Sequence, residues 1–244
     1  MKTMPSFNQV EWYWNRLRCM SVSEIMGRAG KQASHAMARR REPVSVPQAR
    51  FERSGARWLP REIPESAGQA VARANEVLSG HWRIFASGAV PLGFPPEWNR
   101  NPDKGALLPM HFGKAMSFRD PAETGDIKYL WEPNRHLELV CLAQAWQVTG
   151  DPRYLDAIGT ALDSWFIQCP YPLGPNWSSA LEAGIRLINW ATVWQLIGGL
   201  QSPLFANPLG KVLRTDWLNS VWRHAEFIRG HRSGHSSANN HLIG

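Results

Sequence analysis

The residues best suited to chemistry lie near the end of the chain, in Ser236-Ser237-Ala238-Asn239-Asn240-His241. The amides of Asn239 and Asn240 donate hydrogen bonds without carrying charge, and the His241 imidazole donates, accepts or moves a proton near neutral pH. Such groups suit a site where negative charge grows on an oxygen and is stabilised. Because Ser and Asn are also ordinary helix-capping residues, a purely structural role is the alternative interpretation.

A second group is Trp131-Glu132-Pro133-Asn134-Arg135-His136, at the head of a helix expected over 132–148. Arg135 is suited to binding a planar carboxylate through two parallel hydrogen bonds. Glu132 and His136 are four residues apart and are expected to share a helix face. The alternative is a first-turn Glu132 that complements the helix dipole, with Arg135 solvated at the surface.

The third group begins at Asn176-Trp177 and continues along the next helix with Glu182, Arg186, Asn189 and Trp190. Glu182 and Arg186 have the spacing of a helical ion pair. The other side of this helix carries the apolar residues Leu181, Ile185, Ile188 and Val193, so we expect the polar stripe to face solvent or a cleft. The alternative combines a capping box at Ser179–Glu182, a surface ion pair and a core Trp.

No metal or cofactor site is predicted. His231 and His235 have the spacing seen at metal sites, but Ser and Gly separate them and no acidic or thiol partner is near. Cys19, Cys141 and Cys169 are odd in number and widely spaced, so neither a disulfide framework nor a metal motif follows.

The elements that must position these groups are predominantly helical. Helices are expected over 67–78, 132–148, from Asp151-Pro152 to about 168, from 180 to about 197, and over 207–229, separated by turn residues such as Gly150 and Gly198-Gly199. Residues 81–90 have β-type character, and 91–109 form a long irregular loop. Sequential helices joined by short turns stack as antiparallel hairpins, which predicts an all-α fold.

Composition is that of a globular protein, with 43% hydrophobic and 19% charged residues. Of the net charge of +7, the segment Met1–Glu42 carries +5, from eight Lys or Arg and three Glu. This basic arm, with a helix expected over Val10–Met26, suits contact with nucleic acid, anionic lipid or an acidic polymer, or is a solvated helix face. Neither a transmembrane segment nor a signal peptide is expected, and the compartment is not predicted.

The domain organisation follows from a segment rich in Pro, Arg and Ser at Arg41–Pro64, which is typical of a linker. We therefore expect a basic N-terminal helical arm and linker over 1–53, followed by one helical domain over 54–244.

From about Ala74 to Gly244 the chain resembles the heparinase II/III-type polysaccharide lyases. The segments that carry this resemblance are Asp126–Arg135, Thr149–Tyr154, Asn176–Arg186 and Ser236–His241, in the family's order and spacing. It implies the N-terminal part of an α/α toroid of helical hairpins, truncated at its C-terminus. The substrate-binding residues that it implies are Trp131, Arg135, Asn176, Trp177, Glu182 and Arg186. We expect Trp131, Arg135, Trp177 and Arg186 to converge on one surface.

The activity implied by the resemblance is β-elimination at the C4–O4 bond of a uronic acid in an anionic polysaccharide. Asn240 takes the family's carboxylate-neutralising role and His241 the supporting one. Family members continue with more toroid helices, a catalytic tyrosine, a further histidine and a β-sandwich. The chain's own tyrosines (Tyr13, Tyr129, Tyr154 and Tyr171) do not occupy the base position. The chain alone is therefore expected to be inactive, with the C-terminal toroid helices and β-sandwich as missing partners.

Two other functions fit the same residues. The chain could bind acidic polysaccharide without turnover, through Arg135, Arg186 and its tryptophans. It could also be a basic scaffold that binds nucleic acid or anionic membrane through Met1–Glu42. The lyase hypothesis, in contrast, expects no nucleic-acid partner and no cofactor.

Overall fold

The computed structural model describes residues 67–85, 88–116 and 124–231, together with Leu59 and residues 14, 15, 18–22, 26 and 30. The chain divides into two compact units, Met1–Glu42 and Pro43–Gly244. In the first unit the guanidinium of Arg18 lies 5.8 Å from the centre of the Trp14 ring. Most of the predicted 10–26 helix and of the 41–64 linker lies outside the described residues.

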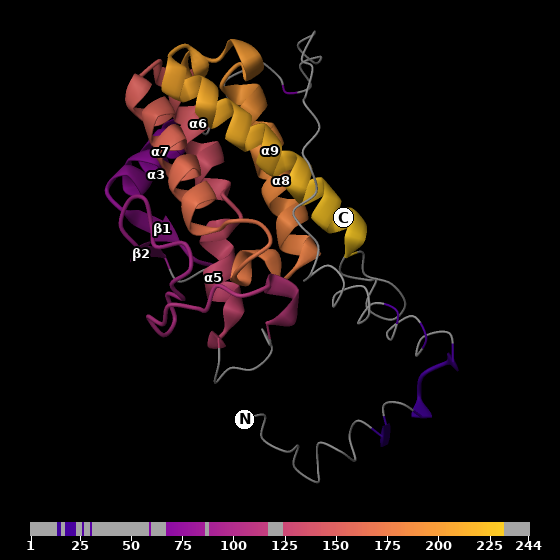
Figure 1. Cartoon of the computed structure of the whole chain (residues 1–244). Helices are drawn as coiled ribbons and strands as arrows, with labels where there is room; N and C mark the ends of the chain where they lie inside the picture. Colours follow the sequence, from indigo (N-terminus) through magenta and orange to yellow (C-terminus); the bar gives the residue numbers. More distant parts are fainter. Residues whose placement is uncertain are drawn as a thin grey trace. The chain divides into compact units, whose positions relative to one another are not determined.

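The second unit is helical, as predicted (Figure 1). Its helices are α3 (Ala67–Leu78), α5 (Ile127–Asn134), α6 (Leu137–Thr149), α7 (Pro152–Gln168), α8 (Ala180–Leu196) and α9 (Pro208–Gly230). Its strands, β1 (His81–Arg83) and β2 (Ala89–Pro91), form one antiparallel hairpin in which Trp82 lies opposite Val90. Short 3-10 turns occur at Gly113–Ala115, Pro175–Trp177, Gly199–Gln201 and Pro203–Phe205.

Local capping residues start two of the long helices where the sequence predicts. The Asp151 carboxylate accepts a hydrogen bond from the Arg153 N–H, and Pro152 occupies the first position of α7. The side chain of Asn207 accepts from the Gly210 N–H at the start of α9. Ser179 is the N-cap of α8, but its side chain makes no capping hydrogen bond. The capping-box prediction is therefore correct for the position and wrong for the hydrogen bonding.

The prediction of one helix over 132–148 is wrong, because α5 and α6 are separate helices. Between them His136 has a left-handed backbone, with φ of 62°. That conformation costs a non-glycine residue about 1–2 kcal/mol, and it is held because the His136 side chain is fully buried. Glu132 lies before this break and is only partly buried. The two residues consequently do not share a helix face.

The helices pack in a continuous array in which α6 is central. Helix α6 contacts α3, α7 and α8, and α9 in turn contacts α7 and α8 (Figure 1). From Leu139 to Ala143 every residue of α6 is buried, as expected for a helix that is covered on all sides. The predicted apolar face of α7 is buried from Tyr154 to Trp165, while Phe166 is half-buried.

Six tryptophans dominate the core. They are Trp82, Trp98, Trp165, Trp177, Trp190 and Trp217, and each is at most 1% exposed. All three cysteines are free thiols, with Cys141 and Cys169 buried and Cys19 exposed. Among the helices that the structure describes, none combines the length and apolar character required to cross a bilayer.

The start of α9 supplies a test of the packing. A Cβ atom at Gly210 would lie 2.1 Å from the Leu204 carbonyl oxygen and 2.9 Å from the Phe205 Cα. Because both contacts are with backbone, Gly210→Ala must displace the preceding turn, and we expect it to lower the free energy of unfolding by about 1–3 kcal/mol. Urea denaturation of the chain measures this loss.

The matched control is Gly184→Ala in the middle of α8, where a Cβ would meet no atom within 4 Å. Alanine there should raise the free energy of unfolding by about 0.5–1 kcal/mol, since glycine weakens a helix interior. Equal stability of the two variants would show that the turn before α9 is not packed as described.

Candidate functional site

Arg135 lies in the turn between α5 and α6 and is held by two carboxylates. Its Nε and Nη2 donate to the two oxygens of Glu182, at 2.8 and 3.0 Å, and its Nη1 donates to Glu132. These hydrogen bonds to Glu182, which is 3% exposed, raise the pKa of the Arg135 guanidinium. The bidentate carboxylate geometry expected of Arg135 is therefore present, with a carboxylate of the chain itself as its partner.

Arg186 lies on α8 one turn after Glu182 and is fully buried. Its Nε donates to the Asn134 carbonyl oxygen at 2.6 Å, its Nη1 donates to His224 Nε2 at 2.9 Å, and the guanidinium carbon lies 4.6 Å from the centre of the Trp165 ring. Burial lowers the pKa of Arg186 to about 10, so the side chain remains a cation at neutral pH. Glu182 and Arg186 therefore do not form the surface ion pair of the alternative interpretation. Glu182 pairs with Arg135, and Arg186 binds Asn134 and His224.

Hydrogen bonds from Arg186 and Trp190 fix two buried histidines, His224 and His136, in their neutral forms. Arginine only donates, so His224 Nε2 must accept and its Nδ1–H donates to the Ser220 carbonyl at 2.7 Å. His136 Nδ1 accepts from Trp190 Nε1 at 2.8 Å, which places its proton on Nε2. Burial, together with the charge of Arg186, lowers the pKa of both histidines well below the usual value.

The stripe predicted to face solvent or a cleft instead faces the interior. Glu182, Arg186 and Trp190 are all buried, whereas Ile188 on the opposite side is 50% exposed. Most of their polar atoms have partners on neighbouring elements: Arg135 for Glu182, the Asn134 carbonyl and His224 for Arg186, and His136 for Trp190. Within the described part of the chain, Arg186 Nη2 is buried and makes no hydrogen bond. The prediction for this helix face is therefore wrong for these three residues, whereas Asn189 is partly exposed and lines a pocket described below.

Asn176 and Trp177 are also part of the interior. The Asn176 amide nitrogen contacts Asn99 Oδ1 and Cys169 Sγ, both at 3.2 Å, and Trp177 Nε1 donates to the Cys169 carbonyl at 3.0 Å. Trp131 Nε1 donates to the Pro175 carbonyl at 3.2 Å, which joins α5 to the same loop.

The expectation that Trp131, Arg135, Trp177 and Arg186 share one surface is therefore wrong for Trp177 and Arg186, which are at most 1% exposed. Trp131 is 9% exposed and Arg135 is partly exposed. Aromatic rings and hydrogen-bond acceptors of the core hold the two buried side chains away from solvent.

Arg135 lines a pocket of about 430 Å³, which we call the arginine pocket. Its lining residues come from α3, β1 and its following turn, the α5–α6 region and α8: Arg73, Arg83, Phe85, Glu132, Arg135, Leu137, Glu138, Ile185 and Asn189. Arg73 pairs with the buried Glu138 at 3.3 Å, and Arg83 pairs with Glu76 at 3.1 Å. Burial raises the pKa of the Glu138 carboxyl.

Sequence reasoning missed Arg73, Arg83, Phe85 and Glu138. The first three come from segments with no chemical motif, and only the fold brings them to α6. Glu138 did leave a signal, since it is the one charged residue in helix 137–149. A carboxylate on a buried helix implies a partner, which here is Arg73.

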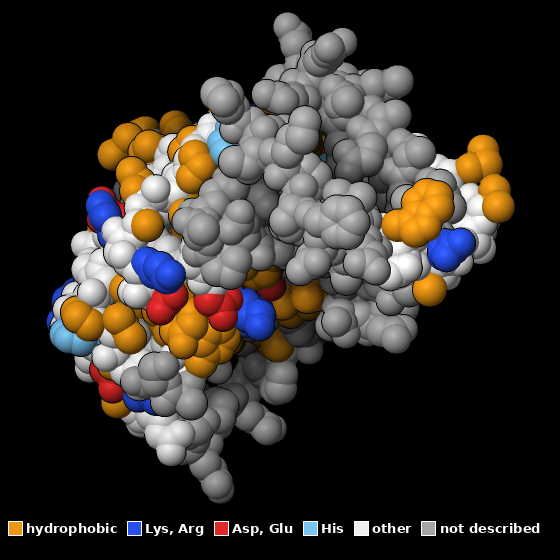
Figure 2. Space-filling view, turned by 90° about the horizontal axis from the view of Figure 1, so that it is seen from below, with side chains coloured by type: hydrophobic (Ala, Val, Ile, Leu, Met, Phe, Trp, Pro, Cys, Tyr) orange, Lys and Arg blue, Asp and Glu red, His pale blue; other side chains and the backbone are white. Residues whose placement is uncertain are grey.

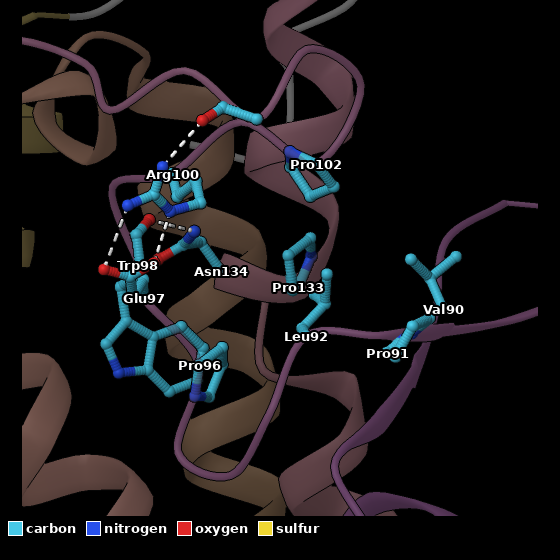
Figure 3. A pocket seen from close by; sticks show the side chains of 11 residues that line it. Val90, Pro91, Leu92, Pro96, Glu97, Trp98, Arg100, Pro102, Pro133 and Asn134 are labelled. Atoms are coloured by element: carbon cyan, nitrogen blue, oxygen red, sulfur yellow. Dashed lines mark hydrogen bonds and ion pairs between the residues drawn. The ribbon is translucent and has the colours of Figure 1, made fainter.

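A second pocket, of about 290 Å³, lies between β2, the loop that follows it and α5 (Figure 3). Prolines form much of its wall, including Pro96, Pro102 and Pro133. Arg100 at its edge pairs with Glu97 and donates to the Gly105 carbonyl at 2.7 Å. Trp98 is 1% exposed, so this pocket presents no aromatic face to a ligand.

Asn240, His241 and His235 lie outside the described residues. His231 is described, and its Nδ1 is 2.8 Å from the Phe227 carbonyl oxygen at the end of α9. In the described part of the chain, no three His, Cys, Asp or Glu side chains are placed to hold a metal ion.

Comparisons with known proteins agree with this fold. The family model described as heparinase II/III N-terminus matches residues 94–244. Among solved structures, a mutant of the heparan sulfate lyase HepC from Pedobacter heparinus is similar, with a TM-score of 0.52 and 16% sequence identity. The alignment covers 86% of this chain and 29% of the lyase chain. No curated protein sequence matches.

The structure is thus an all-α protein, an incomplete α/α toroid of antiparallel helical hairpins. Because the family model spans more than half of the sequence, the chain belongs to the heparinase II/III N-terminus family. The predicted family and fold class are both confirmed.

The two neutral histidines predict how stability depends on pH. As pH falls below about 6.5, the unfolded chain binds protons at His136 and His224 that the native state excludes, so stability decreases. With two such groups the free energy of unfolding should fall by up to about 2.7 kcal/mol per pH unit. The raised pKa of Glu138 acts in the opposite sense, with stability that is present at low pH and lost as pH rises.

Urea denaturation across pH 7 to 5 isolates the histidine contribution when His224→Gln is compared with the native chain. We expect the slope to fall by about half, whatever the variant's absolute stability, because one of two excluded protons is removed. Replacing the exposed His81 by Gln is the control and should leave the slope unchanged. A steep slope that survives in His224→Gln would contradict the assignment.

Proposed function

We propose that this chain is the N-terminal portion of a polysaccharide lyase that cleaves a uronic-acid-containing anionic polysaccharide by β-elimination. The observation that carries the proposal is the family match over 94–244, which includes the Asn239-Asn240-His241 segment. The likeness of the fold to a heparan sulfate lyase supports it. The chain spans 29% of the length of that lyase, so the activity proposed is that of the whole protein.

The chemistry of β-elimination explains why a neutral amide suits the site. A base removes the C5 proton of the uronate, and the electrons of that bond form the C4–C5 double bond. The C4–O4 bond breaks, and its electron pair leaves on O4, which is protonated. Between these events negative charge accumulates on the carboxyl group, and a hydrogen bond from Asn240 stabilises it. His241 supports that arrangement, while the base is supplied from elsewhere in the protein.

The predicted substrate-binding residues divide by exposure into two proposed roles. Arg135 lines the arginine pocket and is the member of the set best placed to contact a sugar. Trp131, on α5, packs instead with Leu108, Met116, Ile127 and Leu130. Glu182 positions Arg135 through its two hydrogen bonds. Asn176, Trp177 and Arg186 are proposed to hold the loop before α8 and the α5–α6 turn in place, since all three are buried.

The first test of this proposal uses the polypeptide as it stands. Incubation with heparan sulfate, alginate and a uronate exopolysaccharide should release no unsaturated uronide, measured by ultraviolet absorbance. A positioned base typically contributes about 10² to 10⁴-fold to the rate, and an amide at Asn240 cannot take its place. Robust turnover by this chain would show that the base has been assigned to the wrong part of the protein.

The second test concerns Asn240 in a lyase that carries this segment together with the remaining toroid helices. Asn240→Ala should reduce kcat by about 10² to 10³-fold, by analogy with the loss of one oxyanion-hole donor. Asn240→Asp should reduce it further, because its carboxylate repels that of the substrate. Neither substitution should alter the melting temperature appreciably.

Asn239→Ala is the matched control for this series. If Asn239 only caps the following helix, its loss should lower stability by about 1 kcal/mol and leave the rate nearly unchanged. Kinetics and melting curves on the three variants decide the assignment. A larger loss of rate at position 239 than at position 240 would mean that the register within the motif is wrong by one residue.

A further inference from the structure

The arginine pocket combines an exposed apolar surface with hydrogen-bonding groups. Two of its apolar lining residues are well exposed: Phe85 is 46% exposed and Leu137 is 45% exposed. The Phe85 and Tyr129 rings form a T-shaped contact, with ring centres 5.3 Å apart and planes at 89°. Phe85 also has a positive φ of 51°, a strained conformation for a bulky residue. Strain of this kind clusters at binding sites, where the surrounding structure holds the residue in a useful position.

The charges of the pocket are compensated within the chain. Each of its three guanidiniums has a carboxylate partner: Glu138 for Arg73, Glu76 for Arg83, and Glu132 with Glu182 for Arg135. Three cations therefore face four carboxylates, so an anionic ligand would have to displace a carboxylate already in place. Acidic and basic side chains also lie next to one another, among hydrophobic ones, on the face shown in Figure 2.

Donors and acceptors are nevertheless left over on the same walls. Within the described part of the chain, Arg83 Nη1, Asn189 Oδ1 and Glu132 Oε1 make no hydrogen bond to another protein group, although each side chain is anchored through another atom. A hydroxyl group donates one hydrogen bond and accepts others, so it is satisfied by such a mixture. A ligand with several hydroxyl groups and an apolar ring face matches this surface and the ring of Phe85.

We propose that the arginine pocket binds an uncharged pyranose unit, with Phe85 packed against the apolar face of the sugar ring and Arg83, Asn189 and Glu132 bonded to its hydroxyls. The volume of about 430 Å³ lies in the range of small-molecule sites. The inference rests on the proposed function in one respect: the unit belongs to the same polysaccharide as the uronate. It adds that the polysaccharide carries neutral sugars and that these are recognised apart from the acidic ones.

The experiment uses three small glycosides as probes and the 244-residue chain. The neutral probes are the methyl glycosides of glucose and N-acetylglucosamine, and the matched acid is methyl glucuronide, which differs from the glucoside at C6 alone. Ligand-observed NMR titration should give a Kd that is roughly millimolar for at least one neutral glycoside. Methyl glucuronide should bind the pocket no more tightly than the glucoside.

Two variants locate the binding. Phe85→Ala should weaken binding of the neutral glycoside by about tenfold, whereas Trp222→Ala, which removes an exposed aromatic ring from α9, should leave it unchanged. Both side chains are exposed, so both variants should retain the circular dichroism and melting temperature of the native chain. If methyl glucuronide binds the basic arm instead of the pocket, its affinity should be the same in Phe85→Ala and in the native chain, which distinguishes the two sites.

Three results would overturn the proposal: no binding of any neutral glycoside, equal affinity in Phe85→Ala and the native chain, or glucuronide binding that is tighter, salt-sensitive and lost in Phe85→Ala. The last would make the pocket an anion site. None of these probes undergoes β-elimination. A failed glycoside titration therefore leaves the lyase proposal to be judged by the Asn240 variants. If the Asn240 variants contradict the lyase proposal, the result of the glycoside titration still stands.

Discussion

The buried cation of Arg186 is the constraint on which the surrounding structure depends. A charge removed from water is tolerated only when the protein supplies acceptors and polarisable neighbours around it. Here the Asn134 carbonyl, the His224 imidazole and the face of Trp165 do so, and they come from α5, α9 and α7. One side chain of α8 thereby contacts three other helices, and the loss of any partner would remove one of the contacts that compensate for its burial.

Burial, together with the charge of Arg186, keeps both buried histidines neutral, and the contact with Arg186 is made at the end of α5. Helix α5 ends at Asn134, whose carbonyl accepts from Arg186. Two residues later, the left-handed backbone of His136 turns its imidazole toward Trp190. Arg135 lies between these two residues in the chain, and its side chain binds Glu182 and lines the pocket. In this turn Asn134 and His136 contact the interior, whereas Arg135 lines the candidate site. The buried contacts of the two interior residues hold the turn and so fix the position of Arg135.

How much of this could be predicted depends on the range of the interactions involved. Starts of helices such as Asp151-Pro152 and Asn207 are set by neighbours two or three residues away, and the sequence predicts them correctly. The inward-facing stripe of α8 could not be predicted from helical spacing, because partners 38 to 54 residues distant satisfy its polar groups. The arginine pocket is more remote still, since its walls combine α3 and β1 with α6 and α8.

The crowding of indole rings in the core has an optical consequence. Ring centres of Trp165 lie 6.0 Å from Trp177 and 5.6 Å from Trp190, and Trp190 is 6.3 Å from Trp217. At such separations absorbed energy passes between indoles faster than it is emitted, so these rings act as one coupled chromophore. Their emission therefore reports the integrity of the whole helical array, and any loosening that separates α7, α8 and α9 changes a signal shared by all three.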